Sequence, residues 1–226
     1  MLHDILIKAA LYAIPLLLAV TAHEVAHGWM AEKLGDPTAR AMGRLTLNPL
    51  VHIDLMGTIV LPLMLILIQS PFLFGWAKPV PVNFANLRGG RRDMALVALS
   101  GPATNLLLAM ASAVAYHVLL AGFQGGWIAA EGALAWLAEP LLLMVRISLI
   151  FNLVLMAFNL IPILPLDGGR ILVGVLPAGL AVRLESLERY GMLIFLLIIA
   201  VPVLRASLWG YFLNPIVDTF MRLLLG

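Results

Sequence analysis

Long apolar stretches constrain this chain more than any other feature. Four of them, residues 5–34, 93–122, 139–161 and 190–209, each reach the length of about 20 residues that a helix needs to cross a bilayer. Hydrophobic residues make up 62% of the chain and charged residues 12%, against roughly 45–50% and about 25% in soluble domains. A water-soluble fold of 226 residues could not bury so much apolar surface. We therefore predict an all-α polytopic membrane protein with about 4–6 transmembrane helices, forming one domain over residues 1–226.

Basic residues between the apolar stretches predict the topology. The link 122–138 contains no Lys or Arg and is expected outside, whereas the loops 31–54 and 75–92 are basic and are expected inside. The apolar segment 55–74 therefore has basic loops on both sides. We predict that it forms a re-entrant or membrane-surface hairpin between the first and second full spans. An additional ordinary span is the alternative, and it would place one basic loop on the wrong side.

Several classes of function have no support in the sequence. The net charge of +2 is spread over single residues and short groups, so no basic tract for nucleic acid is present. The sequence has no glycine-rich phosphate loop, which argues against nucleotide binding. It also has no cysteine, which excludes thiolate zinc ligands and a cysteine nucleophile.

The segment His23-Glu24-Val25-Ala26-His27 lies within the first apolar stretch. Histidines at positions i and i+4 lie on one helix face, so both imidazoles can bind one Zn²⁺, and the adjacent Glu can act as a general base. Ionisable side chains within a membrane helix are costly and indicate function by default. The alternative is a pair of buried histidines that bond neighbouring carbonyls.

A catalytic zinc site usually has three protein ligands, and Asp167 is the best candidate for the third. It follows an apolar span, after Pro162 and Pro165 and before two glycines. Because the chain makes two membrane crossings between Glu32 and Asp167, both are expected on the same side of the membrane. The alternative is that Asp167 is only a turn residue in an Asp-Gly pair.

Together, these motifs resemble the site-2 protease family of intramembrane zinc metalloproteases. HEVAH in one membrane helix and LDGGR after a later one carry the resemblance, which covers nearly the whole chain. The stretches Gly43–Pro49, Gly75–Asn83 and Gly101–Asn105 are similar to compact bacterial members without PDZ or CBS domains.

The resemblance implies a set of site residues. It gives His23, His27 and Asp167 as ligands of one Zn²⁺ per chain, and Glu24 as the catalytic base. It also suggests that Asn159 faces the catalytic water or the oxyanion, and that Asn105 is a polar lining residue that contacts substrate. Both asparagines could instead form hydrogen bonds between helices.

The predicted function is an intramembrane zinc metalloendopeptidase that hydrolyses peptide bonds within or near transmembrane segments. Its expected partners are a transmembrane-protein substrate and the lipid bilayer, with the active site on the cytoplasmic side of a prokaryotic plasma membrane. A helical substrate has to unwind locally before attack, because its carbonyls are hydrogen-bonded, and we expect residues 40–90 to receive the unwound strand. The alternatives are another membrane HExxH protease that processes lipidated C-termini, a non-proteolytic metal-handling protein, or a catalytically inactive relative.

Overall fold

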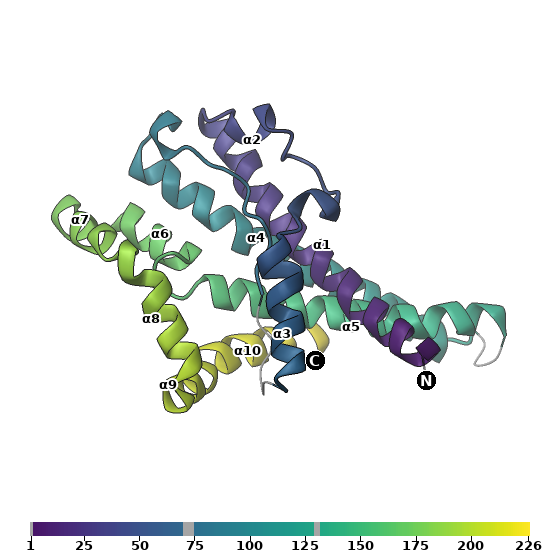
Figure 1. Ribbon diagram of the computed structural model, residues 1–226. Coiled ribbons are helices and arrows are strands. Elements are labelled where there is room, and N and C mark those ends of the chain that lie inside the picture. Colours follow the sequence, from purple (N-terminus) through teal and green to yellow (C-terminus); the bar gives the residue numbers. More distant parts are fainter. Residues whose placement is uncertain (1, 70–74, 129–131) are drawn as a thin grey trace.

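All regular structure in the described part of the chain is helical, as predicted (Figure 1). The structure is a computed structural model, and it describes residues 2–69, 75–128 and 132–226. In chain order the elements are α1 (Leu2–Leu34), α2 (Thr38–Ala41), η1 (Pro49–His52), η2 (Leu55–Val60), α3 (Leu61–Leu67), η3 (Phe84–Asn86), α4 (Arg91–Gln124), α5 (Ala133–Asn159), α6 (Asp167–Val175), α7 (Ala178–Ser186), α8 (Glu188–Ala200), α9 (Pro202–Ser207), η4 (Leu208–Leu213) and α10 (Asn214–Leu225).

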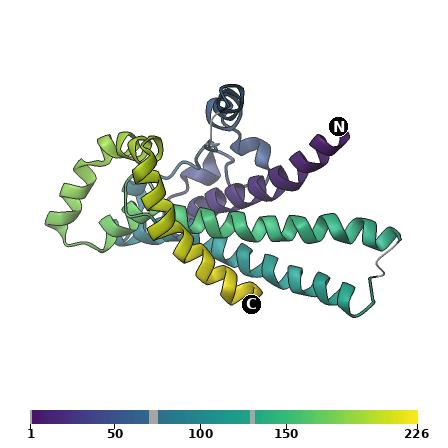
Figure 2. The same cartoon turned by 90° about the horizontal axis from the view of Figure 1, so that it is seen from below.

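Helices α4 and α5 form the centre of the molecule and lie side by side (Figure 2). Ala109 and Ala113 of α4 are buried against Leu149 and Leu153 of α5. Small residues on one helix let the backbones approach closely, which favours packing between membrane helices. Helix α10 covers the same cluster through Phe220 and its apolar neighbours.

Helix α1 packs against both α4 and α5. Ala19 and Ala31 are almost fully buried, so small side chains again contribute to the contact. The helix ends at Leu34, and Gly35 follows with a φ of +117°. A side chain is strained at that φ, so glycine suits the turn out of the helix.

A buried carboxylate fixes the loop that follows α1. Asp36 accepts hydrogen bonds from the backbone and hydroxyl of Thr38, from the backbone N–H of Asn83 and from the side-chain amide of Asn86. Burial alone would raise the pKa of Asp36, but these hydrogen bonds hold it below its ordinary value. The end of α1 is thereby tied to the segment that leads into α4.

The apolar segment predicted as a hairpin forms one short helix within its described residues 55–69. It begins as a π-helical turn at Leu55 and continues as α3 to Leu67. Thirteen helical residues span about 20 Å, less than the roughly 30 Å hydrocarbon core. Residues 70–74, the end of the predicted hairpin, lie outside the described residues.

The two ends of this segment meet, as a hairpin requires. The backbone N–H of Trp76 donates to the carbonyl of Gly57 at 3.1 Å, and that of Lys78 donates to the carbonyl of His52 at 2.8 Å. Gly57 is needed here, because a Cβ would lie 2.4 Å from the Trp76 ring. The chain after the apolar segment therefore runs beside the residues that precede it.

Length and hydropathy give two to three candidate membrane spans within the described residues, against the predicted count of about 4–6. Within the described residues α4 and α5 qualify, and α8 with the segment from Pro202 to Leu225 would be a third if a bend of 88° is allowed. Helix α1 has 33 residues, more than the about 20 that a membrane span needs. The structure also differs from a straight span over 190–209: Pro202 follows the end of α8, and a proline supplies no N–H to continue a helix.

Candidate metal centre

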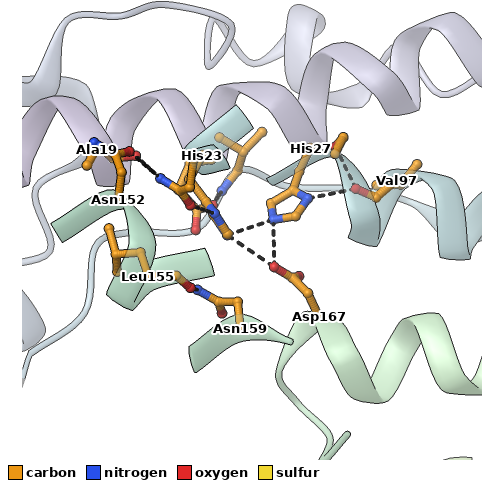
Figure 3. Close-up of polar contacts among 12 residues, drawn as sticks. Ala19, His23, His27, Val97, Asn152, Leu155, Asn159 and Asp167 are labelled. Carbon is orange, nitrogen blue, oxygen red and sulfur yellow. Dashed lines mark hydrogen bonds and ion pairs between the residues drawn. The ribbon is translucent and has the colours of Figure 1, made fainter. Parts of the chain in front are cut away.

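Two imidazoles on α1 point at one another (Figure 3). His23 and His27 lie one helical turn apart, and their Nε2 atoms are separated by 3.0 Å. His23 is buried and His27 is half-buried, in the half of α1 that packs against α4.

Asp167 completes the group from the other end of the sequence. It is the first residue of α6, and its Oδ2 atom lies 3.1 Å from Nε2 of His23 and 3.3 Å from Nε2 of His27. The two glycines after it pack directly on the preceding turn, where a Cβ on Gly168 would lie 2.4 Å from the Ile161 carbonyl oxygen. Glycine is therefore required for the backbone approach that brings Asp167 beside α1. The structure thus brings together the three residues that the sequence selected.

Helix α4 contacts both imidazoles at their Nδ1 atoms, on the side away from Asp167. Nδ1 of His23 lies 2.6 Å from Oδ1 of Asn105, and Nδ1 of His27 lies 2.8 Å from the carbonyl oxygen of Val97. Both partners are acceptors, so each Nδ1 carries the proton and donates it. In this tautomer the lone pair of each Nε2 is free to bind a metal. Hydrogen bonds to Nδ1 usually fix this tautomer in histidines that bind metals.

The three ligand atoms fit a zinc ion. Ligands about 2.0–2.1 Å from a tetrahedral zinc lie roughly 3.3 Å apart, and the three atoms here are separated by 3.0, 3.1 and 3.3 Å. Oδ2 of Asp167 is buried and has no hydrogen-bond donor. Three acceptors at this distance repel one another unless a cation lies between them. The donor set of two imidazoles and one carboxylate suits Zn²⁺.

Gly101 lets α4 approach the centre, a role that the sequence analysis missed. A Cβ at this position would lie 2.5 Å from the His27 ring and 2.6 Å from the His23 ring. Val97, Gly101 and Asn105 recur at intervals of four, so they share one face of α4. The four-residue spacing of Gly101 and Asn105, one small and one polar residue in an apolar helix, was the available signal.

Asn105 lies fully inside the protein, with an exposed fraction of 0%. Its amide oxygen faces His23, and its amide nitrogen donates to Oδ1 of Asn152 at 2.8 Å and to the carbonyl oxygen of Ala19 at 3.3 Å. Asn152, which the sequence analysis did not select, also donates to Ser148. These contacts favour the interhelical role that the sequence left open for Asn105, because both ends of its amide are used within the protein.

Asn159 is the last residue of α5. Its side-chain nitrogen donates to the carbonyl oxygen of Leu155 at 3.0 Å, within the same helix (Figure 3). This contact leaves its predicted role at the catalytic water or oxyanion a prediction.

Glu24 is held by the loop that precedes η3. Its Oε2 accepts a hydrogen bond of 2.8 Å from the backbone N–H of Val80. One turn further along α1, a Cβ on Gly28 would lie 2.6 Å from Val80 Cγ1. The absence of a side chain at Gly28 therefore lets Val80 lie against α1 beside Glu24.

Comparison with known proteins gives the family. YwhC of Bacillus subtilis strain 168, provisionally named a zinc metalloprotease, is 38% identical over 210 residues, which cover 93% of this chain and 89% of YwhC. Rip2 of Mycolicibacterium smegmatis, with the same provisional description, is 28% identical over 84% of this chain and 66% of Rip2. No protein-family model and no solved structure matches the chain significantly. The identity to YwhC over nearly all of both sequences, together with the metal-ligand group, shows that this protein belongs to the site-2 protease family of zinc metalloproteases, hydrolases that act on peptide bonds and bind Zn²⁺.

Proposed function

We propose that this protein is an intramembrane zinc endopeptidase that cleaves peptide bonds within or near the transmembrane segments of other membrane proteins. The observation that carries this proposal is the position of the ligand group. Its two histidines lie on α1 and Asp167 begins α6. Helix α1 packs against α4 and α5, the two described helices that are long and apolar enough to cross a bilayer. A substrate that reaches the centre through lipid is itself a membrane segment.

The three ligands share one role, and Asn105 supports it. Nε2 of His23, Nε2 of His27 and Oδ2 of Asp167 would hold the zinc ion, and Asn105 would keep the His23 ring in the orientation that this requires. Zinc bound there would polarise the scissile carbonyl and lower the pKa of a bound water to about 7.

Glu24 would act as the general base. Its position next to His23 in the HEVAH segment is that of the base in HExxH enzymes. One carboxylate oxygen is held by the N–H of Val80, which leaves the other to take a proton from water and pass it to the leaving amine. Asn159, at the end of α5, would face the oxyanion.

We propose that residues 40–90 receive the unwound substrate strand. A helix keeps its carbonyls in internal hydrogen bonds, so a substrate helix has to open locally before it can be cleaved. The contact between Val80 and Glu24 supports this region as a wall of the site. Crosslinking of substrate to residues 40–90 tests this, and labelling only on the opposite side of α1 would contradict it.

We further propose that residues 1–226 form one domain in a prokaryotic plasma membrane, with the site toward the cytoplasm. Basic residues support this orientation. Arg40, Arg44, Lys78 and Arg88 follow the C-terminal end of α1 in the chain, and positive loops remain on the cytoplasmic side.

The direct test compares the parent protein with Glu24→Gln in lipid vesicles that contain single-span substrates. We expect Glu24→Gln to reduce kcat by roughly 10²–10⁴-fold with the zinc content unchanged. The matched control is Glu32→Gln on the same helix, because Glu32 pairs with the exposed Arg40 and the variant should cleave like the parent.

The same assay tests the intramembrane part of the proposal. The membrane-spanning substrate should be cleaved, and its apolar segment should contain or adjoin the cut. Cleavage only at sites far from the spanning segment would contradict membrane-segment cleavage, and parent-like activity of Glu24→Gln would contradict the mechanism.

A further inference from the structure

Arg44 is buried, with an exposed fraction of 7%, and the hydrogen bonds described for it go only to backbone carbonyls. Its Nη1 donates to the carbonyl of Val51 at 2.6 Å, and its Nη2 donates to the carbonyls of Lys78 at 2.8 Å and Pro79 at 3.3 Å. A buried guanidinium is costly unless it is well bonded. Its position therefore calls for an explanation.

One peptide group connects Arg44 to Glu24. The carbonyl oxygen of Pro79 accepts from Arg44, and the N–H of Val80 donates to Oε2 of Glu24 at 2.8 Å. These two atoms belong to the same peptide unit, which is planar, so its C=O and N–H point in opposite directions when it is trans. The Arg44 guanidinium thus binds the C=O side of this planar peptide group, and the N–H side binds the Glu24 carboxylate.

The flanking prolines restrict the conformation of the Pro79–Val80 peptide. Val80 lies between Pro79 and Pro81, so its N–H is the single backbone donor of the three residues. A following proline also restricts Val80 to extended backbone conformations. The Val80 side chain is buried, with an exposed fraction of 7%, against the surface left open by Gly28. The donor that Glu24 uses therefore has little freedom to move.

We propose that Arg44 is a positioning residue for Glu24 and acts on it through the Pro79–Val80 peptide. This inference rests on the proposed role of Glu24 as the base. The positive charge at the carbonyl oxygen polarises the peptide and strengthens the N–H as a donor. Oε2 stays bound to Val80, and Oε1 remains oriented for proton transfer. Arg44 sets the geometry of the base without touching substrate or metal.

The test measures kcat, KM, zinc content and amide exchange at Val80 in full-length protein in vesicles. Arg44→Met removes the guanidinium, and Arg44→Lys keeps the charge but loses the planar fork. We expect kcat to fall about 10–100-fold, most in the Met variant, while KM and zinc content stay close to parent values. The Val80 amide should exchange faster. The control Arg183→Lys changes an exposed arginine on α7 that lies outside residues 40–90 and outside the ligand group, and it should leave all four quantities unchanged.

A double-mutant cycle separates positioning from general damage. In a Glu24→Asp background the shorter carboxylate already has less reach to Val80, so Arg44→Lys should reduce kcat much less than in the parent. Independent, multiplicative losses would overturn the proposal, as would unchanged kcat in both Arg44 variants or a loss that follows zinc content. If Glu24→Gln is as active as the parent, the proposed function is wrong. The exchange rate of the Val80 amide then still shows whether Arg44 holds the Pro79–Val80 peptide.

Discussion

The proposed zinc ligands and the proposed base are held by different kinds of structure. His23 and His27 are supported by α4, where Val97 and Asn105 accept their Nδ1 protons within a packed group of apolar helices. Glu24 accepts a hydrogen bond from a proline-flanked loop, and Arg44 donates to the same peptide group of that loop. Helix packing thus determines the metal geometry, whereas loop conformation determines the base geometry. Variants of the helices should therefore change zinc affinity, and variants of the loop should change kcat with zinc retained.

The largest effect on the helix side is expected for Asp167→Ala. This change removes one of the three ligands, so zinc affinity should fall by more than the roughly 10–100-fold that a lost supporting bond costs. Metal analysis after dialysis against a weak chelator measures this. Asp218→Asn on α10 is the control, because Asp218 is outside the ligand group, and it should bind zinc like the parent. Full zinc content in Asp167→Ala would contradict the ligand assignment.

A smaller effect is expected for Asn105→Leu. Leucine has the same branching and the same number of side-chain heavy atoms as asparagine, but it cannot accept the Nδ1 proton of His23, so zinc affinity should fall by about 10–100-fold. Ser112→Ala is the matched control on α4, because Ser112 bonds Ser148 across the same helix pair and not a ligand. Competition with a chromogenic chelator gives both affinities. An equal loss in the two variants would indicate that Asn105 contributes only to packing.

The smallest effect is expected for Asp36→Asn in the loop. Asparagine cannot accept the N–H of Asn83 with its NH₂ group, and leaving that donor unpaired should cost about 1–3 kcal/mol of stability. Because the pKa of Asp36 is lowered by folding, its contribution is fully present above the unfolded value of about 3.9 and is lost as pH falls through the folded value.

Thermal unfolding of the parent and Asp36→Asn at neutral and acidic pH tests this contribution. The difference in Tm between the two proteins should be present at pH 7 and should shrink as the pH falls below about 3.9. A constant difference at all pH values would show that the charge of Asp36 has no role.

The grouping of His23, His27 and Asp167 could be predicted from the sequence, because it depends on local spacing and on the order of the helices. The i, i+4 spacing of His23 and His27 determines a shared helix face. The number of membrane crossings determines which end of the molecule Asp167 reaches. The helical class follows from apolar length, because a helix satisfies its own backbone in lipid.

Other features depend on tertiary contacts that the spacing of residues in the sequence does not reveal. Arg44 and Glu24 meet at one peptide only after the chain has left α1 and returned as the 76–81 segment. Asn105 has the same sequence signal whether it contacts substrate or His23, and only the packing of α4 on α1 distinguishes the two. The bend at Pro202 was visible as a proline, yet its angle of 88° depends on what the following helices pack against.

The most direct test of the metal centre is zinc X-ray absorption spectroscopy on the purified protein. The structure predicts a four-coordinate zinc with two imidazoles and one carboxylate oxygen at about 2.0–2.2 Å, and loss of the carboxylate contribution in Asp167→Ala. A zinc ion bound by one imidazole or none, or a parent-like spectrum in Asp167→Ala, would contradict the account.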